Sequence, residues 1–209
     1  MNDVAVPSKV SVRQMLKAFH YALEDYNGRM EQEVEFTLYA KVPSLNEIEK
    51  LAVRKEVHEQ WDLPVKPPAS LDGRVRLRKI DDRRNTMTTK IKRSAVPGFE
   101  EVNADISEDL FKHLREFCSR GFKKTRYDIP IPSSDLKWEV DVFLSQSGAA
   151  HPWVKIDVEV HNLSDKIPDL PFAYEEAFFA DDPDLEESKR RFIDQLWNSE
   201  WCPLPARHE

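Results

Sequence analysis

Cationic side chains alternate with apolar ones between residues 74 and 93 of an otherwise acidic chain. This segment holds nine Lys and Arg residues and two Asp residues, whereas the rest of the 209 residues include 22 basic and 36 acidic ones. Arg74, Arg76 and Arg78 alternate with Val75 and Leu77, and residues two apart on a strand point to the same face. After a polar turn, the pattern continues with Thr86, Thr88, Lys90 and Lys92. We therefore expect two neighbouring strands that present cations on one side, a surface that suits a polyanion.

Ionisable residues alternate on five further segments, where they are sorted by sign. The acidic sets are Glu33/Glu35, Glu101/Asp105, Glu139/Asp141 and Asp157/Glu159, and the basic set is Lys124/Arg126. An antiparallel sheet with one face in water gives such alternation, with ion pairs across strands. Turned inward, the same faces would bury so much charge that a ligand must compensate it. A polyphosphate would neutralise the cations, and Mg²⁺ or Mn²⁺, which prefer oxygen ligands, would neutralise the carboxylates.

The elements that would position these residues follow from hydrophobic periodicity and capping signals. The expected helices are about 10–27, Ser44 toward Trp61 with the capping box Ser44/Glu47, Ser107 to a stop at Gly121, and about 183–199. The expected strands are 31–41, 74–78, 86–92, 100–106, 122–131, 136–144 and 153–162. Together they predict an α+β fold with one domain over residues 1–209 and a strand core at about 31–162.

Composition excludes several classes of protein. No stretch approaches the roughly 18 apolar residues of a membrane span, and the N-terminus lacks a secretion signal, so we expect a cytoplasmic protein without a membrane partner. Two cysteines, Cys118 and Cys202, make no disulfide framework. A pI near 5.5 speaks against binding of duplex DNA. The five glycines form no phosphate-binding loop. The six histidines do not cluster, and we expect each, His58 near a helix end included, to occupy a surface or satisfied core position.

The order of the charged motifs resembles that of the CYTH domain, part of the triphosphate tunnel metalloenzyme superfamily. The similarity runs from Glu33 to Glu159. In chain order, EVE at 33–35 resembles the opening ExExK signature, VRLR at 75–78 the paired-arginine strand, TTK at 88–90 the T-x-K strand and EVNADI at 101–106 the acidic fourth strand. KTRY at 124–127 and WEVDVF at 138–143 are closest to the family, and DVEV at 157–160 resembles its closing ExE.

The resemblance implies a closed antiparallel β-barrel of about eight strands, with helices packed outside and a tunnel through the middle. It implies that the triphosphate is bound by Arg76, Arg78, Lys90, Lys124 and Arg126. It implies that one or two divalent metals, Mg²⁺ or Mn²⁺, are held by Glu33, Glu35, Asp141, Asp157 and Glu159. The residues implied to be catalytic are Glu33, Glu35, Arg76 and Lys124. In such a site, cations stabilise the transferring phosphoryl group while the metal orients water.

Three functions follow from the resemblance. The first is metal-dependent hydrolysis of a triphosphate, namely tripolyphosphate, thiamine triphosphate, a nucleoside triphosphate or an RNA 5′-triphosphate. The second is cyclisation of ATP, as in class IV adenylate cyclases. The third is a non-catalytic triphosphate-binding module, because Thr37 stands where the ExExK signature has its lysine. The expected partner is accordingly a small-molecule triphosphate or nucleotide, or an RNA 5′ end, and the expected state is a monomer or homodimer.

Overall fold

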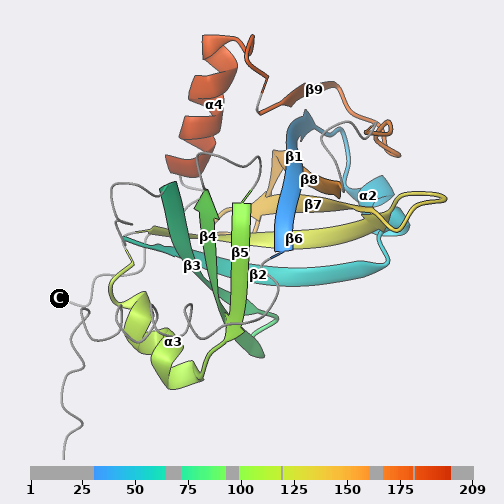
Figure 1. The fold of residues 1–209 in the computed structure, drawn as a ribbon. Helices are drawn as coiled ribbons and strands as arrows, with labels where there is room; N and C mark the ends of the chain where they lie inside the picture. The colour runs from blue at the N-terminus through green and yellow to red at the C-terminus, as the bar shows by residue number, and fades with distance from the viewer. Residues whose placement is uncertain are drawn as a thin grey trace, which may run out of the picture. The chain divides into compact units, whose positions relative to one another are not determined.

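The computed structural model describes residues 31–64, 72–92, 99–118, 120–160, 167–180 and 182–198. In chain order its elements are β1 (Glu31–Lys41), α2 (Asn46–Leu51), β2 (Arg54–Leu63), β3 (Asp72–Ile80), β4 (Arg84–Lys92), β5 (Phe99–Asp105), α3 (Glu108–Arg115), β6 (Arg120–Pro130), β7 (Lys137–Leu144), β8 (Ala150–Val160), β9 (Glu176–Phe179) and α4 (Glu187–Asn198). The helix expected at about 10–27 lies outside the described residues. The last expected helix, about 183–199, corresponds to α4 (Figure 1).

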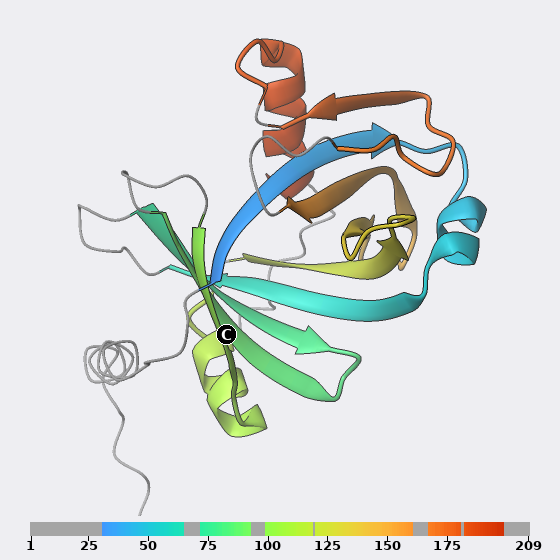
Figure 2. The same ribbon diagram turned by 45° about the vertical axis from the view of Figure 1, so that its right-hand side comes forward.

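The strands form one curled antiparallel sheet of nine strands, in the order β5-β4-β3-β2-β6-β7-β8-β1-β9 (Figure 2). The expected closed barrel of about eight strands is therefore wrong. The ends of the sheet meet only where Glu31–Glu33 pair with Phe99–Glu101. From Leu38 onward, the same edge of β1 pairs with β9 instead. The α+β expectation also needs correction, because strands dominate the described residues and only three helices accompany them.

The two faces of the sheet differ in chemistry, as the alternation predicts. One face, here called the charged face, carries Glu35, Arg76, Lys90, Lys124 and Asp141, which successive strand registers place on the same side. The opposite face is apolar and is covered by helices. Its residues on β1, β6, β7 and β8 form a core cluster with Ile48 of α2. Next to it, Trp61 of β2 meets Phe111 of α3 with ring centroids 5.5 Å apart.

Strand β2 is the largest departure from the expected elements. The helix that starts near Ser44 was expected to run toward Trp61, but α2 ends at Leu51 and β2 begins at Arg54. The reason is periodicity: from Val57 the side chains alternate between the two faces, and β2 pairs with both β3 and β6. Gly121 is not a helix stop either. It lies in β6, where it packs beneath the indole ring of Trp61.

The charged face ends in an aromatic cluster. Tyr39, Phe122 and Phe143 are buried there and pack with Phe178 of β9 and Leu196 of α4. The rings of Tyr39 and Phe178 stack with centroids 5.8 Å apart. The cluster therefore covers one end of the charged face, and the polar residues described below occupy the remainder. In the described part of the chain, no helix is long and apolar enough to cross a bilayer.

Candidate functional site

The strand registers gather the ionisable residues of eight strands on the charged face. Directly opposed pairs are Glu35 with Glu159, Thr37 with Asp157, Asp141 with Lys155, Arg126 with Asp141, His58 with Lys124, Asp62 with Arg76 and Lys90 with Glu101. Opposed side chains in an antiparallel sheet lie close enough for direct contact. The site is thus built by pairing of the sheet, and its residues lie between Glu35 and Glu159 in the sequence.

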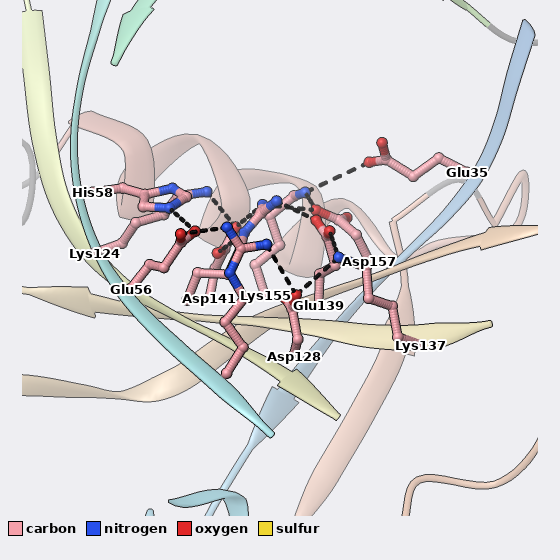
Figure 3. A network of polar contacts seen from close by, with 12 residues as sticks. Glu35, Glu56, His58, Lys124, Asp128, Lys137, Glu139, Asp141, Lys155 and Asp157 are labelled. Carbon is pink, nitrogen blue, oxygen red and sulfur yellow. Dashed lines mark hydrogen bonds and ion pairs between the residues drawn. The ribbon is translucent and has the colours of Figure 1, made fainter. Parts of the chain in front are cut away.

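A first group of contacts centres on Asp141, which is 1% exposed (Figure 3). Arg126 donates from Nε and Nη2 to the two carboxylate oxygens of Asp141, each over 2.8 Å. Lys124 contacts the same carboxylate, and Arg126 also contacts Glu139. Burial would raise the pKa of Asp141, but Arg126 and Lys124 outweigh it and hold that pKa well below its usual range. Burial, followed by the charge of Arg126, lowers the pKa of Lys124 to about 7.

A second group centres on Glu35. Lys90 donates to Glu35 over 3.1 Å and forms an ion pair with Glu101 at 2.8 Å. Lys155 lies 3.7 Å from Glu35 and also contacts Asp157. Burial would raise the pKa of Glu35, but the charges of Lys155 and Lys90 lower it to about 2. Because Lys90 belongs to β4 and Glu35 to β1, this contact joins strands that β5 separates in the sheet.

The third group consists of Arg76 and Arg78 on β3, which make no close ion pair of the kind that Lys90, Lys124 and Arg126 make with carboxylates among the described residues. The Nε atoms of both arginines are buried and have no hydrogen-bond partner among the described residues. Arg76 is 3.9 Å from Asp62, at the limit of an ion pair. Burial, followed by the charges of Arg74 and Arg78, lowers the pKa of Arg76 to about 10. Burial, followed by the charge of Arg126, lowers the pKa of Arg78 as well. Burial is therefore the main cause of both shifts, and neighbouring cations add to it while carboxylates such as Glu101 act against it.

The predicted metal ligands do not form one group. Among the described residues, no three His, Cys, Asp or Glu side chains come together to hold a metal ion. Asp141 binds Arg126, Asp157 accepts a hydrogen bond from Thr37 over 2.7 Å, and Glu35 binds Lys90. The side chain of Glu33 lies outside the described part. In this arrangement Glu35, Asp141 and Asp157 do not fit a divalent cation, because each of them already contacts a Lys or Arg side chain.

Glu159 differs from the other predicted metal ligands. Burial, followed by the negative charges of Glu139 and Glu35, raises its pKa above the usual range. Its register partner is Glu35 itself. Two carboxylates on neighbouring strands therefore repel each other at this edge of the charged face, and a cation that bound there would relieve the repulsion.

Three residues of the site were missed in the sequence. Lys155 shares strand parity with Asp157 and Glu159, so alternation alone could have identified it. His58 and Gln60 are 3% and 2% exposed, and each has a side-chain atom that is buried without a hydrogen-bond partner. They were missed because β2 was expected to be helical. Of the predicted phosphate-binding residues, the structure brings Lys124 and Arg126 together at Asp141, whereas Lys90 lies with Glu35 and the two arginines form a group on β3.

Comparison with known proteins adds little to this geometry. No family model and no curated protein matches the chain. Among solved structures, a protein from Bacillus halodurans described as a "putative adenylate cyclase" matches with 14% identity and a TM-score of 0.39, over 63% of this chain and 82% of that one. At that TM-score the likeness carries no argument about this chain. The resemblance to the CYTH domain accordingly rests on the chain's own motifs alone.

Proposed function

We propose that this protein binds the triphosphate group of a small molecule on the charged face and hydrolyses it. One observation carries the proposal: Arg76 and Arg78 each have a buried Nε atom that no described residue hydrogen-bonds. Leaving a charged group buried and unpaired costs several kcal/mol, so an anion that enters the site recovers that cost. Phosphate is well matched, because a guanidinium offers it a planar set of N–H donors.

The surroundings favour a polyphosphate over a single phosphate group. Lys90 of β4, Lys124 of β6 and Arg126 of β6 lie on the same face as the two arginines. Each of these three is already held by a carboxylate, namely Glu35 or Asp141. They are thus fixed in position while their charge is partly balanced. A chain of phosphates can contact the unused donors of Arg76 and Arg78 first and then extend toward Lys90, Lys124 and Arg126.

The chemistry that these residues supply is electrostatic. Arg76 and Arg78 would donate hydrogen bonds to phosphate oxygens, and each charge-assisted bond contributes about 1.5–3 kcal/mol. Preorganised cations stabilise the charge that develops as a phosphoryl group is transferred, because they need not reorient during the reaction. The requirement for Mg²⁺ or Mn²⁺ stays a prediction from the motif resemblance.

A direct test combines calorimetry with product analysis. The purified protein is titrated with tripolyphosphate, ATP and orthophosphate, and then incubated with each triphosphate in Mg²⁺ or Mn²⁺. We expect tripolyphosphate to bind more tightly than orthophosphate and orthophosphate to be released from a triphosphate. Cyclic AMP with pyrophosphate would instead identify a cyclase, and binding without turnover a binding module.

The matched variants are Arg76→Ala and Arg83→Ala. Arg83 is exposed in the turn between β3 and β4, away from the charged face. Arg76→Ala should weaken tripolyphosphate binding about 10- to 100-fold, and Arg83→Ala should leave it unchanged. Equal affinities for the two variants would contradict the proposed site.

A further inference from the structure

His58 is a buried histidine on the charged face whose two ring nitrogens differ. Its Nε2 lies 3.1 Å from the Oε2 atom of Glu56, whereas its Nδ1 is buried and has no hydrogen-bond partner in the described part of the chain. An ionised carboxylate can only accept, so Nε2 carries the hydrogen in this contact. In the neutral ring, Nδ1 then holds the lone pair. His58 therefore presents a basic nitrogen whose hydrogen-bonding capacity the described residues leave unused.

The position of His58 lies within the proposed phosphate site. In β2, His58 is paired with Lys124 of the neighbouring strand β6 and with Ile80 of the other neighbour, β3. Arg78 is two residues from Ile80 on the same face, so it lies diagonal to His58, at about 7–8 Å in an antiparallel pair. Figure 3 shows His58, Glu56 and Lys124 grouped beside the contacts of Asp141. The imidazole thus stands between a predicted phosphate-binding lysine and an unpaired arginine.

The surroundings of His58 favour the neutral ring. Burial, followed by the charge of Lys124, lowers the pKa of His58, and Arg126 acts in the same direction. Glu56 and Asp141 act in the opposite direction without reversing the shift. Glu56 is itself held by Arg54, so the carboxylate that orients the ring has a fixed position. An oriented neutral imidazole is the usual form of a general base.

We infer that His58 is the general base that activates water in triphosphate hydrolysis at this site, with Glu56 orienting its ring. The inference rests on the proposed function. A water molecule beside the terminal phosphate donates its proton to Nδ1 as its oxygen bonds to phosphorus. The bond from phosphorus to the bridging oxygen breaks, and that oxygen leaves as the anion of the remaining diphosphate. Glu56 stabilises the imidazolium, which then returns its proton to solvent.

The discriminating variant is His58→Gln, compared with His113→Gln on the exposed surface of α3. Affinity for tripolyphosphate is measured by calorimetry, and orthophosphate release is measured across pH. We expect His58→Gln to lower kcat at least about 100-fold while the Kd stays unchanged. The fall of kcat/KM toward low pH, which reports protonation of the base, should disappear in this variant. His113→Gln should behave like the wild type.

A second readout guards against misfolding of the first variant. In His58→Ala, added imidazole should restore part of the lost rate, because it can enter the vacated space and accept the proton. Unchanged kcat in His58→Gln would overturn the inference, and so would joint loss of affinity and turnover, which indicates a binding role. If the wild type binds tripolyphosphate without turnover, the base assignment is wrong while the binding site stands. Absence of binding by the wild type would contradict the proposed function itself.

Discussion

The hydroxyl of Thr37 donates a hydrogen bond to Asp157 over 2.7 Å, across the pairing of β1 with β8. Thr37 occupies the place where the motif resemblance expects a lysine. The ammonium of Lys155 contacts the same carboxylate of Asp157 and lies 3.7 Å from Glu35, which Thr37 also contacts at 3.3 Å. A cation is therefore present beside Thr37, but the neighbouring strand supplies it.

Moving the ammonium group from Lys155 on β8 to position 37 on β1 tests whether its strand of origin affects tripolyphosphate binding. We expect Lys155→Ala to weaken tripolyphosphate binding about tenfold, since it removes one cation from the charged face. Adding Thr37→Lys to Lys155→Ala should restore most of the affinity, because the new ammonium can reach the same two carboxylates. Calorimetry on the wild type and both variants measures the Kd for tripolyphosphate. A double variant that binds no better than Lys155→Ala would show that the charge cannot be moved.

The unpaired state of Arg78 predicts opposite effects on stability and on binding. Replacing a buried, poorly compensated charge with an apolar side chain is often neutral or stabilising. We expect Arg78→Met to raise the free energy of unfolding by about 1 kcal/mol and to weaken tripolyphosphate binding about 10- to 100-fold. Urea unfolding and calorimetry measure the two quantities. Arg83→Met, in the exposed turn, should change neither.

The sequence predicted which residues share the charged face better than it predicted how the sheet ends. Alternation fixes the face of a side chain, because the strand period is two, and Arg76, Lys124 and Asp141 accordingly share one face of the sheet. Closure of the sheet into a barrel depends on which strand pairs with the edge of β1 that faces away from β8. In the structure β9 pairs with this edge, and no local sequence pattern predicts the pairing of a strand of four residues.

The sequence predicted the face on which the site lies better than it predicted the contacts between the site's residues. Sequence alternation shows charges but not their partners, so nothing in it separates the paired Lys90 from the unpaired nitrogen of Arg78. The missed strand β2 shows a second reason. The capping box and apolar spacing that precede it favoured one long helix from Ser44, whereas the alternation from Val57 and the pairing with β3 and β6 make the segment from Arg54 extended. His58 was lost with that strand.

Acid should destabilise the protein through Glu35. Its pKa is lowered from an ordinary 4.5 to about 2 in the folded state. The ionised carboxylate therefore contributes stability that is fully present above the unfolded pKa and is lost as the pH falls through the folded one. The lost contribution is at most roughly 3 kcal/mol. Urea unfolding at about pH 5 and about pH 2 should show a smaller decrease for Glu35→Gln than for the wild type. Equal decreases would mean that the pair with Lys90 and Lys155 adds nothing.

Chelation should separate binding from turnover. Glu35, Asp141 and Asp157 each contact a Lys or Arg side chain, and the described residues form no group of three metal ligands. Arg76 and Arg78 can bind phosphate by themselves, so we expect tripolyphosphate to bind in the presence of EDTA. Orthophosphate release should require Mg²⁺ or Mn²⁺, because Mg²⁺ commonly enters such sites with the substrate phosphates. Calorimetry and product analysis with and without EDTA measure the two effects. Loss of binding on chelation would show that the metal is needed for recognition as well.

Gly121→Ala should lower the free energy of unfolding without changing tripolyphosphate binding. A Cβ atom at this position would overlap the indole ring of Trp61 and lie 2.9 Å from the carbonyl oxygen of Gln60. Relief of this overlap would displace Trp61 from Phe111 on the apolar face, so we expect Gly121→Ala to cost about 2–4 kcal/mol in urea unfolding. The comparison is Gly148→Ala, where φ is +82° but no atom lies within 4 Å. It should cost about 1–2 kcal/mol from backbone strain alone. Neither variant should alter the Kd for tripolyphosphate under conditions where it is folded. A weaker Kd in Gly121→Ala would mean that the apolar face beneath β2 helps to position His58 and Gln60 on the other side.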